Sequence, residues 1–385
     1  MEAAVPRERP SRGRQEMARQ NTGAGGGAAA LTRRGFQAGL GALGASMLAG
    51  RARAAGLTLA EVQAASGPVN ILGAQTYETP ASWPKDLQVH WAYNTTNEEI
   101  LTKTTQPGTF DAVIIYQGEI DQLRKLDRLV PVQTDLLEDW KLVAPLFRDA
   151  SVIRRDGQVF AVPFHWGYGY LEYNSAKTSA PRSLQDLMSP KLTKKIGLPN
   201  DPYAVITTFA LFAGYQNANN LTRDQFNATI KLLKSFRPQV LTIHNYGDEP
   251  ALFARGDIWV GFPEYSDSIV LCHKAGATAV KSTMLAAWSY VDCLMVLKAA
   301  EHVPAAYKFI NSCLSTASQE LTTAHSLAFP VNDAAISALP KELQYTSSEA
   351  VLKNAPLMPG VTVETGGPDV PFQEWVQAWE EFKAA

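Results

Sequence analysis

Cysteine is scarce in this chain of 385 residues, which contains only Cys272, Cys293 and Cys313. None of the three is spaced as C-x-x-C, and three cysteines form at most one disulfide, whose existence the spacing leaves open. Cys272 precedes His273, but no glycine elbow or triad context surrounds this pair. We therefore expect buried structural cysteines and a protein that is not an enzyme.

The sequence also lacks a membrane span and, beyond its N-terminal region, an excess of basic charge. The weakly apolar run at 35–50 is too short and too rich in glycine to cross a bilayer. Residues 1–55 hold nine Arg and three Glu of the 35 basic and 37 acidic residues, so 35 − 9 = 26 basic and 37 − 3 = 34 acidic residues remain. A net charge near −8 predicts no binding to nucleic acid.

The N-terminal 55 residues have the layout of an export signal. Arg33–Arg34 precedes the weakly apolar run, and Ala52-Arg53-Ala54 supplies an A-x-A cleavage pattern. The paired arginine indicates twin-arginine (Tat) export, with an arginine-rich disordered tail as the alternative, and either Met1 or Met17 could be the start. Because no cysteine follows the signal, we expect a periplasmic protein without a lipid anchor.

Strand-like and helix-like segments alternate along the rest of the chain. Strands are expected at 69–74, 110–116, 195–201, 257–265 and 290–297, and helices at 96–105, 119–126, 203–215, 222–236 and 304–314, with another at the C-terminus. This alternation predicts an α/β protein with mostly parallel sheets. The remaining length of about 330 residues is more than one hydrophobic core usually holds, so two lobes are expected.

The segment VPFHWGYGYLEYN, residues 162–174, combines the alternation of a strand with two internal glycines. Glycine weakens a strand and marks a bend or a close approach to the backbone. This segment resembles the "VPYxWGTxGLxYN" strand of the polyamine-type solute-binding proteins of ABC importers. Four further segments resemble motifs of that family in the same order across 69–330: GTFDAVIIY, KKIGLPNDPYAV, ALFARGDIWVGFPEYSD and AAWSYVDCLMVLKAAEHVPAAYKFINSCLS.

The resemblance implies a bilobal periplasmic-binding-protein fold of type II, with two mixed, mostly parallel sheets flanked by helices. Two crossing strands, one at 162–174 and one at 290–297, would form the hinge, and the glycines would let the first one bend. Lobe 1 would comprise 56–167 and 292–335, and lobe 2 would comprise 168–291 and 336–385. Such a protein captures a solute between lobes that close around it, and delivers it as a monomer to the membrane subunits of an ABC permease.

Residues matching the family's amine site carry over in part. Polyamine binders hold the amine with carboxylates and aromatic faces, which attract ammonium groups. Asp292 matches the family's main amine ligand, and Asp201 matches an acidic position that would equally suit a helix N-cap. Ala204 replaces a family glutamate, and Glu264 stands where the family often has an aromatic residue. The expected ligand-binding set is Gln75, Tyr77, Tyr116, Trp166, Tyr168, Asp201, Glu264 and Asp292, with no cofactor and no metal.

The family's glutamate and a family tryptophan are replaced here by Ala204 and Ala74, and these two departures leave the solute open. A polyamine, a smaller amine or a zwitterionic amino acid suits the expected site, and the lack of a matched arginine disfavours an anion that needs a bidentate clamp. Two alternatives remain, an enzyme on this fold and a ferric-iron or other solute carrier. The candidate iron ligands are His165, Tyr168, Tyr265 and Tyr290.

Overall fold

The computed structural model describes residues 56–94, 97–245, 247–358 and 370–385. The expected export signal at 1–55, with its alternative start at Met17, lies outside these residues. One half of the described chain is built on parallel strands in the order β2-β1-β3. β1 (Gly67–Gly73) pairs in parallel with both β2 (Leu87–Tyr93) and β3 (Ala112–Tyr116).

The other half repeats this arrangement with later segments of the chain. β7 (Ile196–Pro199) pairs in parallel with both β8 (Val240–His244) and β9 (Val260–Tyr265). Their order, β9-β7-β8, again places the first strand in sequence at the centre. The strands β1, β3, β7 and β9 are mostly buried, as expected for strands covered by helices on their faces, whereas the outer strands β2 and β8 are more exposed.

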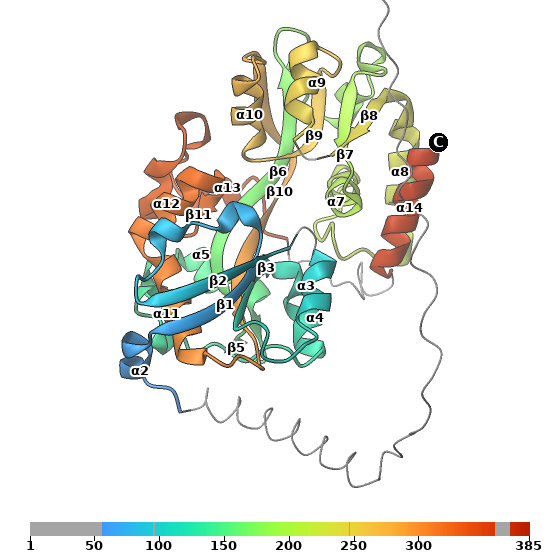
Figure 1. The fold of residues 1–385 in the computed structure, drawn as a ribbon. Helices are drawn as coiled ribbons and strands as arrows, with labels where there is room; N and C mark the ends of the chain where they lie inside the picture. The colour runs from blue at the N-terminus through green and yellow to red at the C-terminus, as the bar shows by residue number, and fades with distance from the viewer. Residues whose placement is uncertain (1–55, 95–96, 246, 359–369) are drawn as a thin grey trace, which may run out of the picture. The chain divides into compact units, whose positions relative to one another are not determined.

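Two long strands connect the halves, as Figure 1 shows. β6 (Val162–Asn174) and β10 (Val280–Val296) run antiparallel to each other, β10 also pairs with β3, and β6 also pairs with β9. The halves are thereby joined in one hydrogen-bonded path, β2-β1-β3-β10-β6-β9-β7-β8. The α/β fold with two crossing strands is as expected, and β6 has the predicted bounds.

Several elements differ from their expected bounds or were not expected. β10 begins ten residues before the expected start at 290, and its pairing with β6 shifts register between Thr283 and Trp288. At this irregularity Ala286 has a positive φ of 53°. The periodic pattern missed this part because an irregular, half-buried stretch lacks alternation. The short strands are β4 (Arg154–Arg155), β5 (Gln158–Val159) and β11 (Phe329–Pro330), of which β11 pairs with β6.

Helices cover the strands of both halves (Figure 1). Those between 56 and 160 are α2 (Leu59–Ala64), α3 (Asn97–Lys103), α4 (Ile120–Lys125) and α5 (Pro145–Arg148). Those between 184 and 274 are α6 (Leu184–Leu187), α7 (Pro202–Phe212), α8 (Arg223–Phe236), α9 (Glu249–Arg255) and α10 (Ser268–Lys274). The last are α11 (Val303–Leu314), α12 (Thr316–Ser326), α13 (Ser348–Leu352) and α14 (Phe372–Ala384).

The buried apolar side chains form two large clusters. The first cluster contains β1, β3 and α11, and also the later residues Leu339 and Leu343. The second contains α7, α8 and α14, where Trp375 and Trp379 are buried. We keep the lobe boundaries given above as a proposal. The clusters show which side chains pack together, whereas a lobe is a part of the chain that moves as a unit.

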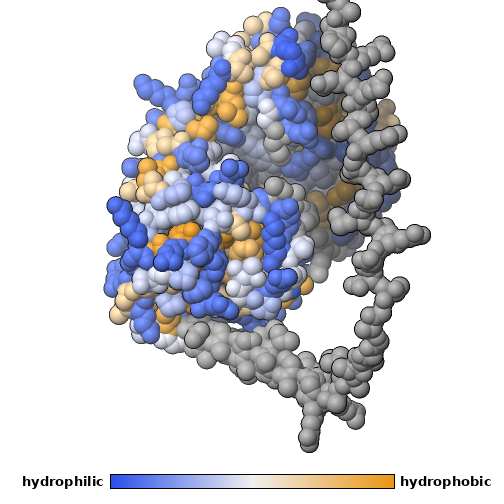
Figure 2. Space-filling view, viewed as in Figure 1, coloured by the Kyte–Doolittle hydropathy of each residue, from blue (hydrophilic) through white to orange (hydrophobic). Residues whose placement is uncertain are grey.

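The described surface and helices carry no sign of a membrane-spanning segment. Among the described residues, no helix combines the length and apolar character needed to cross a bilayer. On the face drawn in Figure 2, hydrophilic residues surround small groups of apolar ones.

Candidate functional site

A cavity of about 710 Å³ lies beside the crossing strand β10. Its walls come from the 3₁₀ turn after β1, from the ends of β3 and β9, from β10 and from the start of α7, together with residues of α14 and of the end of α12. Residues that pack on both hydrophobic clusters therefore line the cavity. The lining residues used below are Tyr77, Tyr116, Glu119, Asp201, Tyr203, Tyr265, Asp267, Trp288, Tyr290 and Asp292.

Asp292 lies on β10, opposite Tyr116 of β3 and His165 of β6. Its carboxylate accepts a short hydrogen bond from the Tyr77 hydroxyl, which belongs to the 3₁₀ turn η1 (Gln75–Tyr77) after β1. Burial raises the pKa of Asp292 to about 6, against the lowering effect of the hydrogen bond from Tyr77. Asp292 is therefore a desolvated carboxylate, for which a bound cation would offset the cost of ionisation.

Asp201 serves the helix and the cavity at once. It is the N-cap of α7, and its Oδ1 accepts a hydrogen bond of 3.0 Å from the Ala204 backbone N–H. Its Oδ2 lies 3.3 Å from the Tyr265 hydroxyl, which donates to it. Both interpretations of Asp201 from the sequence are thus compatible, because one carboxylate oxygen caps the helix while the other faces a cavity residue.

Aromatic rings surround these carboxylates. The Tyr116 hydroxyl lies 2.5 Å from that of Tyr203, and the two rings meet edge to face with centroids 5.7 Å apart. Tyr203 also meets Trp288 edge to face at 5.5 Å, and Tyr265 meets Tyr290 at 5.5 Å. The faces of such rings offer both apolar contact and cation–π attraction to a ligand.

The two glycines of β6 make room for two of these aromatic side chains. Gly167 pairs with Tyr290 and Gly169 pairs with Trp288 across the strands. A Cβ on Gly167 would lie 2.5 Å from the Tyr290 hydroxyl oxygen, and one on Gly169 would lie 2.8 Å from the Trp288 indole. Neither glycine has a positive φ, so close approach of a neighbouring ring accounts for both.

A third segment, near Met358, is hydrogen-bonded to the crossing strand β10. The Gln117 side chain, only 1% exposed, accepts from the Val291 N–H at 2.7 Å and donates to the Met358 carbonyl at 2.9 Å. Ser289 exchanges backbone hydrogen bonds with Pro356 and Met358. This amide therefore ties the end of β3 to β10 and to the segment near Met358.

Of the eight residues expected in the site, four line the cavity and four do not. Tyr77, Tyr116, Asp201 and Asp292 are in the lining.

The remaining four expected residues lie elsewhere. Gln75 is exposed on η1, and Trp166 is buried in the first cluster with its indole N–H donating to the Pro330 carbonyl. Tyr168 packs beside Phe329 with ring centroids 5.2 Å apart. Glu264 is 3% exposed among buried groups of the second half.

Sequence reasoning did not place Tyr203, Asp267 and Trp288 in the amine site, and it considered Tyr265 and Tyr290 only for iron. A usable signal existed for two of the five. Trp288 and Tyr290 precede Asp292 by four and two residues on the same strand, so all three point to one side.

The other expectations concern cysteine and iron. All three cysteines are free and buried, which confirms the expected burial and answers the open question of a disulfide. Of the four candidate iron ligands, only Tyr265 and Tyr290 line the cavity. His165 is fully buried, and desolvation lowers its pKa to about 3.

A family model with the description "Bacterial extracellular solute-binding protein" matches residues 87–356. The chain belongs to this family. The match covers most of the described chain, including both crossing strands and most of the cavity lining, although Tyr77 lies outside it. Because members of the extracellular solute-binding protein family bind solutes and are not enzymes, the expectation of a non-enzyme is confirmed.

Solved structures of solute-binding proteins share this fold. The spermidine/putrescine transporter substrate-binding protein of Streptococcus pneumoniae is 19% identical, with 83% of this chain and 99% of that chain covered and a TM-score of 0.70. The Tp0655 lipoprotein of Treponema pallidum is 16% identical over 82% and 99%, with a TM-score of 0.68. The GacH receptor of Streptomyces glaucescens, solved with acarbose, is 15% identical over 83% and 92%, with a TM-score of 0.62.

These TM-scores show that this solute-binding protein and its structural neighbours share a fold. The neighbours' names include both polyamines and the oligosaccharide-like acarbose. The class of solute that this chain binds is therefore inferred from the residues that line its own cavity.

Proposed function

We propose that this protein captures a small cationic or zwitterionic solute, a polyamine-like amine, and delivers it to the permease of an ABC importer. The observation that carries the proposal is the charge of the cavity. Its lining includes the carboxyl groups of Glu119, Asp201, Asp267 and Asp292 and, among the described residues, no Lys, Arg or His. Such a lining attracts an ammonium group and repels an anion.

The aromatic rings support the same class of solute. Tyr203, Trp288 and Tyr290 supply ring surface close to the carboxylates. Cation–π attraction contributes about 0.5–2 kcal/mol for each well-placed ring, and the alkyl part of an amine fits between rings. We assign Asp292 and Asp201 to ammonium groups and the aromatic side chains to the chain that joins them.

Asp201 and Asp292 come from different parts of the fold, one at the start of α7 and the other on β10. A solute that contacts both, and Tyr77 and Tyr116 of the first half, would hold the two lobes together. Closure about β6 and β10 would then couple binding to recognition by the permease. Export to the periplasm by the twin-arginine route and a monomeric state complete this proposal.

A ferric-iron carrier is the second candidate. Tyr116 and Tyr203, whose hydroxyl oxygens lie 2.5 Å apart, and the neighbouring carboxylates are oxygen donors of the kind that a hard cation prefers. The amine is favoured because the same cavity also offers extensive ring surface, which a bare metal ion does not need.

A melting-temperature panel distinguishes these candidates. The purified protein is heated with putrescine, spermidine, lysine, ferric citrate, a sugar or a dicarboxylate at equal concentration. A solute at a hundred times its Kd stabilises the protein by about 2.7 kcal/mol, which shifts the melting curve clearly. A shift with amines alone supports the proposal, whereas a shift with iron, sugar or dicarboxylate and none with amines contradicts it.

A further inference from the structure

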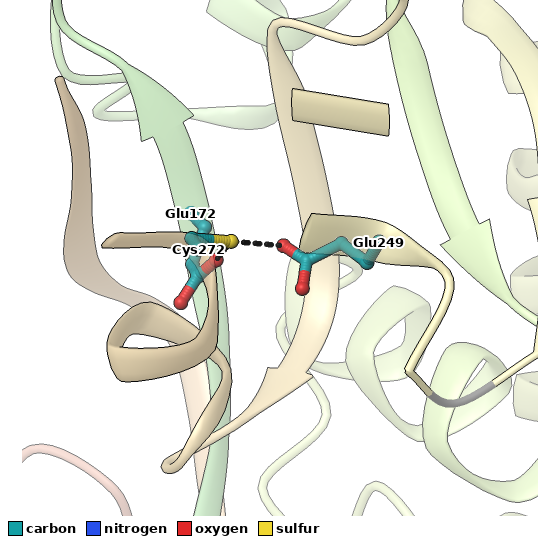
Figure 3. A group of neighbouring side chains, drawn as sticks. All are labelled: Glu172, Glu249 and Cys272. Carbon is teal, nitrogen blue, oxygen red and sulfur yellow. Dashed lines mark hydrogen bonds between the residues drawn. The ribbon is translucent and has the colours of Figure 1, made fainter. Parts of the chain in front are cut away.

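A second group of ionisable side chains is buried away from the cavity. Glu172 on β6, Glu249 at the start of α9 and Glu264 on β9 are 0%, 2% and 3% exposed. Cys272 on α10 is fully buried beside them. Figure 3 shows Glu172, Glu249 and Cys272 pointing toward one another from three different elements. None of the four lines the cavity, so solute binding does not account for them.

The distances in this group suit a metal ion. The Cys272 sulfur lies 3.6 Å from Glu172 Oε2 and 3.7 Å from Glu249 Oε1. One ligand atom from each of the three residues falls within 4.8 Å of the others. Zinc bonds of 2.0–2.2 Å to oxygen and 2.3 Å to sulfur, at tetrahedral angles, separate sulfur and oxygen by about 3.5–3.7 Å. The observed separations are those of two edges of such a tetrahedron.

Glu264 and His244 add an independent observation. Both side chains are more than nine-tenths buried, and neither Glu264 Oε1 nor His244 Nε2 makes a hydrogen bond within the described chain, although they lie 3.3 Å apart. A Cβ on Gly261 would lie 3.0 Å from Glu264 Oε1 and 3.4 Å from Glu249 Oε1. Because glycine has no Cβ, position 261 leaves an open space between Glu264 Oε1 and Glu249 Oε1.

The negative charge of the three buried carboxylates, Glu172, Glu249 and Glu264, must be balanced by a bound cation or by protons. Within the described residues, no Lys or Arg forms an ion pair with Glu172, Glu249 or Glu264. Burying several unpaired carboxylates costs many kcal/mol unless they are neutralised. Shared protons would neutralise the carboxylates but give no reason for a thiol at the same point.

We propose that Glu172, Glu249 and Cys272 bind a divalent cation of the zinc class. Glu264 lies outside this group of three, and its unpartnered Oε1 would complete the coordination after a side-chain movement. A thiolate among carboxylates favours zinc over calcium or magnesium, which prefer oxygen ligands alone. Binding releases the thiol proton to solvent and forms the sulfur–metal bond. The Ser268 hydroxyl, 3.2 Å from Glu172 Oε2 and hydrogen-bonded to Glu249 Oε2, orients both carboxylates.

The role of this site is structural. Its ligands tie β6 to α9, α10 and β9, whose residues are far apart in the sequence. A metal here stabilises the second half of the molecule, from which Asp201 and Tyr265 reach the cavity. Because the metal site and the cavity share no residue, the metal-site proposal does not depend on which solute the protein binds.

The test uses the full chain without a polyhistidine tag, stripped with a chelator and then supplied with Zn²⁺ or Co²⁺ alone. We expect about one equivalent of Zn²⁺ to survive desalting, a higher melting temperature, and a thiolate-to-cobalt absorption band in the near ultraviolet. Cys272→Ser should lose the band and at least tenfold in zinc affinity. The matched control is Cys313→Ser, which alters a buried thiol of α11 and should keep both.

Gly261→Ala tests the geometry with every ligand in place, because its methyl group fills the space between Glu249 and Glu264. We expect zinc affinity to fall about 10- to 100-fold while the solute-induced melting shift is retained. If Cys272→Ser does not fold, Glu249→Gln replaces it in the same assay. A stripped wild-type protein that neither retains Zn²⁺ nor gains stability from it contradicts the proposal, and so does an unchanged cobalt band in Cys272→Ser.

Discussion

The Tyr116 hydroxyl oxygen at the end of β3 lies 2.5 Å from that of Tyr203 in the first turn of α7. Tyr116 packs on the first hydrophobic cluster and Tyr203 on the second. Either hydroxyl can donate, and Tyr203 also accepts from the Asn219 side chain at 3.4 Å. This hydrogen bond joins the two halves of the molecule directly beside the cavity, and it would be present only when the halves are close.

Tyr203→Phe should weaken solute binding without preventing folding. The variant loses the bond to Tyr116, and a hydrogen bond contributes about 0.5–1.5 kcal/mol net, which corresponds to a Kd raised about two- to twelvefold. Titration calorimetry with the best amine of the panel measures this change. Tyr215→Phe, which alters a tyrosine outside the cavity lining, is the control. Equal Kd values for wild type and Tyr203→Phe would contradict a role for this contact in closure.

Asp292→Asn should reduce amine affinity more than tenfold. The substitution keeps the shape of the side chain and an oxygen that accepts from the Tyr77 hydroxyl, but it removes the charge. Hydrogen bonds to charged groups contribute about 1.5–3 kcal/mol. The matched control is Asp149→Asn on the exposed surface. If Asp292→Asn has wild-type affinity and melting temperature, Asp292 is not an amine ligand.

Amine binding should weaken in mild acid. Burial raises the pKa of Asp292 from 3.8 to about 6, so the carboxylate takes up a proton as the pH falls through 6. Since the ionised form binds the cation, affinity should fall about tenfold from pH 7 to pH 5. Burial also raises the pKa of neighbouring Asp267, in the same direction. The Asp292→Asn variant should show a flatter pH profile, and an identical slope in both proteins would contradict the assignment.

The same pKa shift has the opposite effect on the ligand-free protein. A carboxyl group whose pKa is raised on folding contributes stability below its unfolded pKa, near 4, and that contribution is lost as the pH rises through about 6. The contribution of Asp292 to the stability of the solute-free protein should therefore be smaller at pH 7 than at pH 5. Amine affinity should change in the opposite direction and be higher at pH 7. Melting curves with and without amine at both pH values separate these two effects.

Gly167→Ala should destabilise the protein and disturb the cavity. Its Cβ would lie 2.5 Å from the Tyr290 hydroxyl oxygen, so the ring must move, and overpacking of this kind costs about 1–3 kcal/mol. Denaturant unfolding measures the loss. The double variant Gly167→Ala/Tyr290→Ala should be less destabilised than the sum of the single variants, because the clash is gone. Strict additivity would show that the glycine serves another purpose.

Part of this fold could be predicted from local patterns alone. The 13 residues of β6 were delimited correctly, because aromatic residues alternate between a proline near the start and the polar segment after Asn174. The irregular start of β10 was missed, since Ala286 has a positive φ and the segment follows neither a strand nor a helix period.

The cavity residues were predictable where they match family positions, as for Tyr77, Asp201 and Asp292, or follow a buried strand, as for Tyr116. Trp166 was expected in the cavity but lies 1% exposed in the first cluster. Nearly all residues of β6 are buried on both faces, so alternation could not indicate which face meets the cavity. Glu264 shows the same limit, because a sequence position does not reveal that a carboxylate turns toward a buried group.

Calorimetric titration of the purified protein with putrescine and, separately, with succinate tests the central claim most directly. Both molecules carry two charges at the ends of a short carbon chain, but the charges have opposite sign. An acidic, aromatic-lined cavity should bind the diamine with a Kd at least a hundredfold lower than that of the dicarboxylate, and Asp292→Asn should narrow this gap. Tighter binding of succinate than of putrescine would contradict the account of a cationic solute.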